Sequence, residues 1–212
     1  MYESMFVVFI YLFVLSLVGT AILNIIFRFL GKNGYLGNLF PNVRGGIPRA
    51  IGIIPFILLC FYFLPGYNSL ILIVGIFALF DDVLGRQMIK SLSIEWGQLA
   101  RGISMILVIV AGLYLGLGIS AILIALLIQP VNISDMQPGT TCMVTIIMSI
   151  ISIILMLAFG VGPVEELPAI YSPLVLLIVC LGYCPLDFSG KIMLGEVGNH
   201  SFAIALGISF YI

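Results

Sequence analysis

The chain has 212 residues, of which 62% are hydrophobic and only 8% are charged, and its formal net charge is -1. Soluble globular domains carry about 25% charged residues, so this composition excludes a water-soluble domain, which could not cover its surface with so few charges. The nearly neutral charge gives no reason to expect a nucleic-acid partner. The sequence therefore predicts an integral membrane protein.

Apolar runs long enough to cross a bilayer, which takes about 20 residues, follow one another along the sequence. We expect about eight helices, near residues 5–30, 50–64, 68–84, 102–116, 118–131, 140–160, 169–185 and 200–212. The first run is too long for the apolar part of a signal peptide. The charged residue before it is Glu3, whereas a signal peptide begins with basic residues, so we expect this helix to be retained. The predicted fold is all-α, a polytopic transmembrane helix bundle that forms one domain over residues 1–212.

The basic residues fall on one side of this predicted bundle. They belong to its first, third and seventh loops and are Arg28, Lys32, Arg44, Arg49, Arg86, Lys90, Arg101 and Lys191. The opposite side holds Glu3, Glu165 and Glu166 and no basic residue. Because cytoplasmic loops carry the excess of Lys and Arg, we expect the N-terminus outside and the odd-numbered loops in the cytoplasm.

Two adjacent carboxylates, Asp81 and Asp82, end the apolar run "LILIVGIFALF". If the helix stops at Gly85, both lie in its last turn, beside the negative end of the helix dipole. Such a pair needs a positive partner, which could be a divalent cation or the nearby Arg86 and Lys90. The alternative is that the carboxylates only mark the helix end in the headgroup region.

A second polar segment, "QPVNISDMQPG", holds Asn132 and Asp135. These residues are three apart and share a face if the helix continues that far. The flanking Pro130 and Pro138 make the backbone irregular, and irregular backbone at membrane depth usually lines a cavity or a protein interior. In a loop, the same residues would be ordinary formers of Asx turns.

The third polar segment, "SGKIMLGEVGNHS", places Gly195 and Gly198 on either side of Glu196. Glycine lets the backbone approach an anion, and a carboxylate can bind Mg2+ that is held by phosphates. The alternative is a glycine-rich turn with an acidic helix cap. We expect His200, the only histidine, to be an interfacial side chain rather than a ligand.

Acidic clusters and basic loops thus share one predicted face. Arg44 and Arg49 lie in "PNVRGGIPRAIG", and Arg86, Lys90 and Arg101 lie in "DDVLGRQMIKSLSIEWGQLARG". Basic residues near a membrane often only hold anionic headgroups. Together with the acids, they suggest a site with Mg2+ on the carboxylates and phosphates on the bases.

In order and spacing, these segments resemble the polyprenyl-phosphate N-acetylhexosamine-1-phosphate transferase family, which includes phospho-MurNAc-pentapeptide translocase and GlcNAc-1-phosphate transferases. "NVRGGIPRAIG" is similar to the first cytoplasmic loop of that family, "FDDVLGR" to its Asp-Asp motif, and "KSLSIEWGQLARG" to the basic segment that follows. "VNISDMQPG" resembles its N-x-x-D loop, and "LGYCPLDFSGKIMLGEVGNHSFAIALG" the stretch that usually contains G-D-x-G-S. The resemblance covers essentially the whole chain and lies in the shared order of the motifs.

The resemblance implies transfer of N-acetylhexosamine-1-phosphate from a UDP-sugar to polyprenyl phosphate, with Mg2+ as cofactor and UMP as product. It implies work in cell-envelope or peptidoglycan biogenesis at the cytoplasmic face of a bacterial plasma membrane. With the motifs, it assigns catalysis to Asp81, Asp82 and Asp135, and metal binding to Asp82 and Glu196. The residues assigned to substrate binding are Asn132, Lys90, Arg86, Arg44, Gly195 and Gly198. The expected partners are the polyprenyl phosphate lipid, the nucleotide sugar and membrane lipids, and a homodimer is left open.

The sequence departs from the family in two motif positions, because Glu196 replaces aspartate and Asn199 replaces serine. The sequence also ends at Ile212, before the positions of the family's later helices and its His-containing loop. These departures motivate a second hypothesis, a catalytically degenerate paralogue that binds lipid phosphate or assists assembly. A transporter ranks last. Transport usually places charge near the bilayer midplane, and the sequence has no clear charge there. The D-x-x-D-G-x-x-A-R pattern of CDP-alcohol phosphotransferases is not present.

Overall fold

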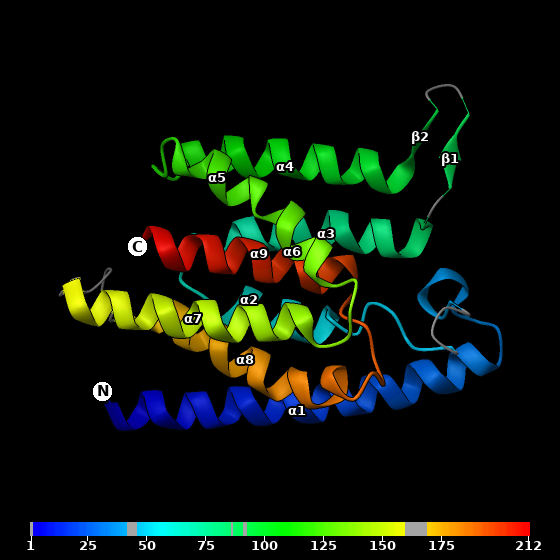
Figure 1. The fold of residues 1–212 in the computed structure, drawn as a ribbon, viewed down its shortest axis with the longest axis horizontal. Coiled ribbons are helices and arrows are strands. Elements are labelled where there is room, and N and C mark those ends of the chain that lie inside the picture. The colour runs from blue at the N-terminus through cyan, green and yellow to red at the C-terminus, as the bar shows by residue number, and fades with distance from the viewer. Residues whose placement is uncertain (1, 42–45, 86, 91–92, 160–168) are drawn as a thin grey trace.

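A computed structural model describes residues 2–41, 46–85, 87–90, 93–159 and 169–212, and it has the predicted all-α architecture (Figure 1). The helices are α1 (Tyr2–Lys32), α2 (Ile53–Tyr62), α3 (Asn68–Leu84), α4 (Trp96–Tyr114), α5 (Ser120–Leu126), α6 (Ile128–Ser134), α7 (Thr140–Phe159), α8 (Tyr171–Phe188) and α9 (Gly195–Tyr211). A short 3-10 helix, η1 (Gly37–Leu39), follows α1. The strands β1 (Met88–Ile89) and β2 (Ile94–Glu95) form an antiparallel hairpin between α3 and α4.

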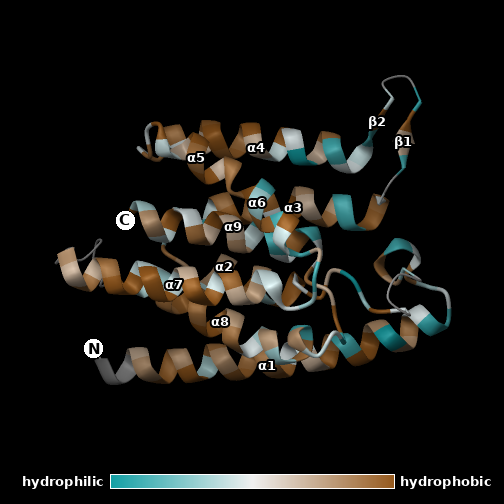
Figure 2. Ribbon diagram, viewed as in Figure 1, coloured by the Kyte–Doolittle hydropathy of each residue, from teal (hydrophilic) through white to brown (hydrophobic). Residues whose placement is uncertain are grey.

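Membrane residence is supported by helices α1, α4, α7 and α8, which are long and apolar enough to cross a bilayer. The outward face of α1 is covered by large apolar side chains, and Phe6 and Phe29 are 66% and 67% exposed. In Figure 2 hydrophobic residues extend along most of the length of the helices. Because water would penalise so much exposed apolar surface, this face suits contact with lipid chains. The chain is a membrane protein.

Helix α9 forms the centre of the bundle. It contacts α2, α3, α5, α6, α7 and α8, and Figure 1 shows it between the α3–α4 side and the α7–α8 side. Its side chains from Val197 to Ser209 are buried all round the helix. A helix that is apolar on every face is stable only where it is enclosed, which explains this position.

Three boundaries differ from the sequence prediction. Helix α9 begins at Gly195 rather than near residue 200, so Glu196 lies in its first turn. Helix α4 begins at Trp96 rather than near residue 102, so Arg101 lies inside a helix and not in a loop. The predicted helix 118–131 consists of α5 and α6, which meet at Leu127. Pro130 lies in the first turn of α6, where a missing N–H group is tolerated. It could not continue a single straight helix from α5 without losing a main-chain hydrogen bond.

The polar residues of the described chain gather at one end of the bundle (Figure 2). At that end lie the last turns of α1, α3 and α8 and the first turns of α4, α7 and α9 (Figure 1). The described basic residues lie in α1 and α4 or in the segments that join the helices at this end, and are Arg28, Lys32, Arg49, Lys90, Arg101 and Lys191. The clustering of charge on one face is therefore confirmed for the described residues, whereas the side of the membrane that this face occupies stays a prediction.

Candidate functional site

The two adjacent carboxylates, Asp81 and Asp82, lie in the last turn of α3, as the sequence predicted. Gly85 ends the helix with a φ of 61°, and its N–H donates to the carbonyl oxygen of Asp81 at 2.8 Å. Both side chains are buried, and Asp82 has no exposed surface. A charge removed this completely from water requires partners of opposite charge or hydrogen-bond donors.

Asp82 finds these donors at the start of α9. The main-chain N–H of Glu196 donates to Asp82 Oδ1 at 3.0 Å, and that of Val197 donates to Oδ2 at 3.0 Å. The first N–H groups of a helix lack partners within the helix and carry the positive end of its dipole. A carboxylate from α3 therefore caps α9 and links two helices that are distant in the sequence.

Gly195 makes this approach of α3 and α9 sterically accessible. Its φ is +73°, and a Cβ atom at this position would lie 2.7 Å from Asp82 Oδ2 and 2.7 Å from the main-chain nitrogen of Ala50. Gly198 has a related role, since a Cβ there would lie 2.9 Å from Gly52 Cα. Both glycines, which the sequence assigned to substrate binding, allow close packing within the chain.

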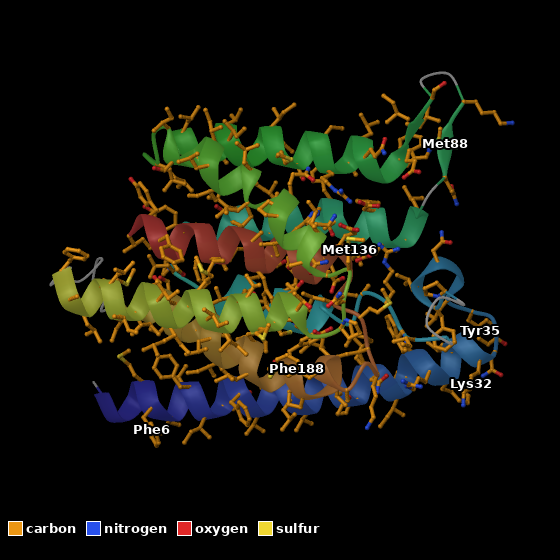
Figure 3. The ribbon with its side chains drawn as sticks, in the orientation of Figure 1. Phe6, Lys32, Tyr35, Met88, Met136 and Phe188 are labelled. Atoms are coloured by element: carbon orange, nitrogen blue, oxygen red, sulfur yellow. The ribbon has the colours of Figure 1, made fainter. Side chains whose placement is uncertain are left out.

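Two arginines complete the site. Arg49 Nε lies 2.9 Å from Asp82 Oδ1, and Arg49 Nη2 donates to Glu196 Oε1 at 3.2 Å. Arg101 Nη2 donates to Asp81 Oδ2 and to Glu196 Oε2, each at 3.0 Å. These contacts join the segment before α2 to the end of α3, the second turn of α4 and the start of α9. Figure 3 shows nitrogen and oxygen atoms gathered between α3, α4 and α9.

Glu196 is the central carboxylate of this network, with 12% of its side chain exposed. Besides the two arginines, His200 lies beside it, with Nε2 at 3.2 Å from Glu196 Oε2. The two residues are four apart on α9 and thus lie on one helix face. His200 has no exposed surface, so the expectation of an interfacial side chain is wrong. Because α9 is enclosed on all sides, the polar side chains of its first turns are buried among the neighbouring helices.

The second predicted motif meets the site through an amide pair. Asn199 Nδ2 donates to Asn132 Oδ1 at 3.4 Å, which places α6 beside the first turns of α9. Asp135 follows directly after α6 and is half-buried. The motif is therefore partly helical, since α6 continues to Ser134 and includes Asn132.

Of the three basic residues that the sequence assigned to substrate binding, the structure describes Lys90. Lys90 is exposed in the turn of the β1–β2 hairpin, which projects beyond α3 and α4 in Figure 1. Arg44 and Arg86 lie outside the described residues. The arginines that contact the acids are Arg49 and Arg101, to which the sequence gave no individual role. An earlier start of α4 would have indicated Arg101, because it then lies four residues after Gly97 on the helix face that meets Asp81.

One further buried acid lacked a signal in the sequence. Asp187, near the end of α8, is 1% exposed and accepts a hydrogen bond from Cys142 Sγ at 3.2 Å. It lies in "CPLDF", where neither spacing nor neighbouring charge distinguishes it from an ordinary helix-end residue. Cys142 belongs to the first turn of α7, so this hydrogen bond connects the start of α7 with the end of α8.

The fit of this site to Mg2+ can be judged from its donors. Carboxylates are suitable ligands for the ion. Here, however, both oxygens of Asp82, both of Glu196 and Oδ2 of Asp81 already face guanidinium, imidazole or main-chain N–H groups. Within the described part of the chain, no group of three or more His, Cys, Asp or Glu side chains is placed to hold one metal ion. In this arrangement the residues do not fit the ion.

Comparisons with known protein families and with curated proteins gave no match to this sequence.

Proposed function

We propose that this chain transfers N-acetylhexosamine-1-phosphate from a UDP-sugar to polyprenyl phosphate, as a phospho-glycosyltransferase of a bacterial plasma membrane with its charged end in the cytoplasm. One observation carries the proposal. Glu196 contacts both Arg49 and Arg101, and these arginines contact Asp82 and Asp81. Segments that resemble separate motifs of the transferase family therefore meet at one point of the bundle.

The chemistry of this point suits phosphate groups at a membrane surface. Guanidinium groups bind phosphate oxygens through charge-assisted hydrogen bonds, and phosphoryl transfer depends mainly on positioning and on neutralising charge. Arg49 and Arg101 would hold the phosphates, and Asp81 and Asp82 would orient the two guanidiniums. Magnesium enters this proposal through the resemblance alone, because the described carboxylates are engaged by donors of the chain.

The test is release of UMP from UDP-N-acetylhexosamines by the purified chain in lipid nanodiscs that contain undecaprenyl phosphate, with and without Mg2+. The informative variant is Arg101→Met, which we expect to lose at least about 100-fold in rate, since it removes a charge held among the reacting phosphates. Lys32→Met is the matched control, because Lys32 is an exposed cation at the same end of the bundle. Absence of UMP release with every sugar nucleotide tested, or equal loss in both variants, would contradict the proposal.

A second candidate is a non-catalytic member that binds lipid phosphate or assists assembly. The favouring observation is the internal pairing of Asp82 and Glu196, whose oxygens are all taken up by donors of the chain. The two candidates differ in one measurement. Binding of polyprenyl phosphate that depends on Arg101, without any UMP release, favours the second, and turnover favours the first.

A further inference from the structure

The carboxylate of Glu196 lies between two guanidinium groups that come from different parts of the chain. Arg49, in the segment before α2, reaches Oε1 at 3.2 Å, and Arg101, in α4, reaches Oε2 at 3.0 Å. Two guanidiniums that converge on one pair of oxygens form the geometry by which proteins hold a phosphate group. Glu196 therefore occupies the position that an external oxyanion would take.

The donors around this carboxylate outnumber its acceptors. Arg49 Nε and Arg101 Nε are buried and lack an acceptor at hydrogen-bond geometry among the described residues, although Arg49 Nε is 2.9 Å from Asp82 Oδ1. His200 is fully buried, and neither of its ring nitrogens has a partner at hydrogen-bond geometry among the described residues, although Nε2 is 3.2 Å from Glu196 Oε2. In its neutral form this ring adds one N–H donor. A carboxylate offers two oxygens, whereas a terminal phosphate offers three, so phosphate would satisfy donors that Glu196 leaves unmet.

The balance of charge explains why Glu196 and a phosphate exclude each other. Three carboxylates, those of Asp81, Asp82 and Glu196, face the two guanidiniums of Arg49 and Arg101. The cluster thus carries one excess negative charge when His200 is neutral. A phosphate that entered beside Glu196 would add like charge in a half-buried site, which is costly. Without Glu196, the remaining carboxylates and guanidiniums balance.

We infer that Arg49 and Arg101 form an oxyanion site for a terminal phosphate group and that Glu196 is its internal competitor. The site is closed while the Glu196 side chain lies between the arginines, and it opens when this side chain swings away. The inference rests on the proposed function in one respect, the choice of phosphate as the anion. It deepens that function, since it gives the site a resting state that excludes its own ligand.

The experiment compares phosphate binding by the full chain and by Glu196→Gln, in phosphatidylcholine nanodiscs with a chelator that removes divalent cations. Calorimetric titration with inorganic phosphate measures the soluble ligand, and the shift in melting temperature on adding phosphatidic acid to the nanodiscs measures a lipid headgroup. We expect Glu196→Gln to bind about tenfold more tightly, since one opposing charge in contact with the site is removed. A gain confined to one arm identifies the source of the phosphate.

Three further variants keep the result decisive. Glu95→Gln removes one negative charge from a half-buried residue at the end of β2, directly before α4, and should leave binding unchanged. Arg101→Met in the Glu196→Gln background should abolish the gain. Glu196→Asp keeps a carboxylate at the α9 N-terminus but shortens its reach, so it should give a smaller gain and serves if Glu196→Gln unfolds.

The inference is overturned if Glu196→Gln and Glu196→Asp melt normally and bind phosphate no more tightly than the unchanged chain. It is also overturned if Glu95→Gln produces the same gain, because the effect is then one of general charge. Neither arm contains a sugar nucleotide. The binding result therefore stands whether or not UMP release is found, and turnover without the Glu196 effect would refute this inference alone.

Discussion

The Asp82 carboxylate accepts the main-chain N–H of Glu196 at 3.0 Å, so a side chain of α3 caps a helix that begins more than a hundred residues later. The same carboxylate accepts the N–H of Val197 and lies against Arg49. One buried carboxylate thus interacts favourably with the positive end of the α9 helix dipole and with the guanidinium of Arg49. The residues of the site therefore also stabilise the helix bundle.

Asp82→Ala should lower the free energy of unfolding by about 3 kcal/mol, since the capping acceptor is lost and Arg49 loses a partner. Thermal melting in detergent, followed by circular dichroism, measures the change. Asp82→Asn is the comparison, because the amide oxygen still accepts one N–H group, and its loss should be smaller. Equal melting temperatures for Asp82→Ala and the unchanged chain would show that α9 does not depend on this cap.

Gly97→Ala should destabilise the chain by about 1–3 kcal/mol, the usual effect of overpacking. A Cβ at this position would overlap Asp81 Oδ1, so α4 would have to move away from α3. Gly102→Ala is the matched control in the same helix, because a Cβ there meets nothing within 4 Å. It should be neutral or slightly stabilising. If both variants melt at the same temperature, α4 does not pack against Asp81 of α3 as closely as the structure shows.

Gly195→Ala should weaken the chain more than Gly190→Ala does. Both glycines have a positive φ, +73° and +63°, so both substitutions introduce about 1 kcal/mol of backbone strain. Only at position 195 does the new Cβ also meet Asp82 and Ala50, whereas at position 190 nothing lies within 4 Å. Melting curves measured side by side separate the steric contribution from the conformational one. Equal losses of stability in the two variants would indicate that the start of α9 lies farther from Asp82 than in this structure.

Arg101 and Glu196 should show favourable coupling in a double-mutant cycle of Arg101→Met and Glu196→Gln. Each single change leaves a half-buried charge with fewer partners, whereas the double change removes both charges. We expect a coupling energy of about 1–2 kcal/mol from chemical denaturation. The control cycle replaces Glu196→Gln by Glu95→Gln and should give no coupling. Additive effects in the first cycle would argue that the ion pair is not formed in the membrane.

The sequence predicted the main features of the fold because its apolar runs are long and its charges are few. The positions of Asp81 and Asp82 at a helix end, and their closeness to Glu196, followed from the charge on one face. The pairing of individual atoms did not follow. It depends on how closely α4 and α9 approach α3, and Gly97 and Gly195 set those distances through contacts between distant segments.

The same limit applies to the basic residues. The resemblance to the transferase family assigned substrate binding to Lys90, which is exposed in the hairpin. The place of a basic residue in a motif does not show whether its side chain reaches the acids. Arg101 lies in α4, and only the position of that helix brings it to Asp81 and Glu196. His200 was judged by its neighbours in the sequence, although burial on the inward face of α9 determines its environment.

The central position of α9 has a consequence for biogenesis. This helix is synthesised after all the helices that enclose it, namely α2, α3, α5, α6, α7 and α8. Until α9 is in place, Asp82 lacks its two main-chain donors, and the faces of these helices that contact α9 are without that partner. The bundle therefore completes its core, and satisfies its most deeply buried carboxylate, in the last step of assembly.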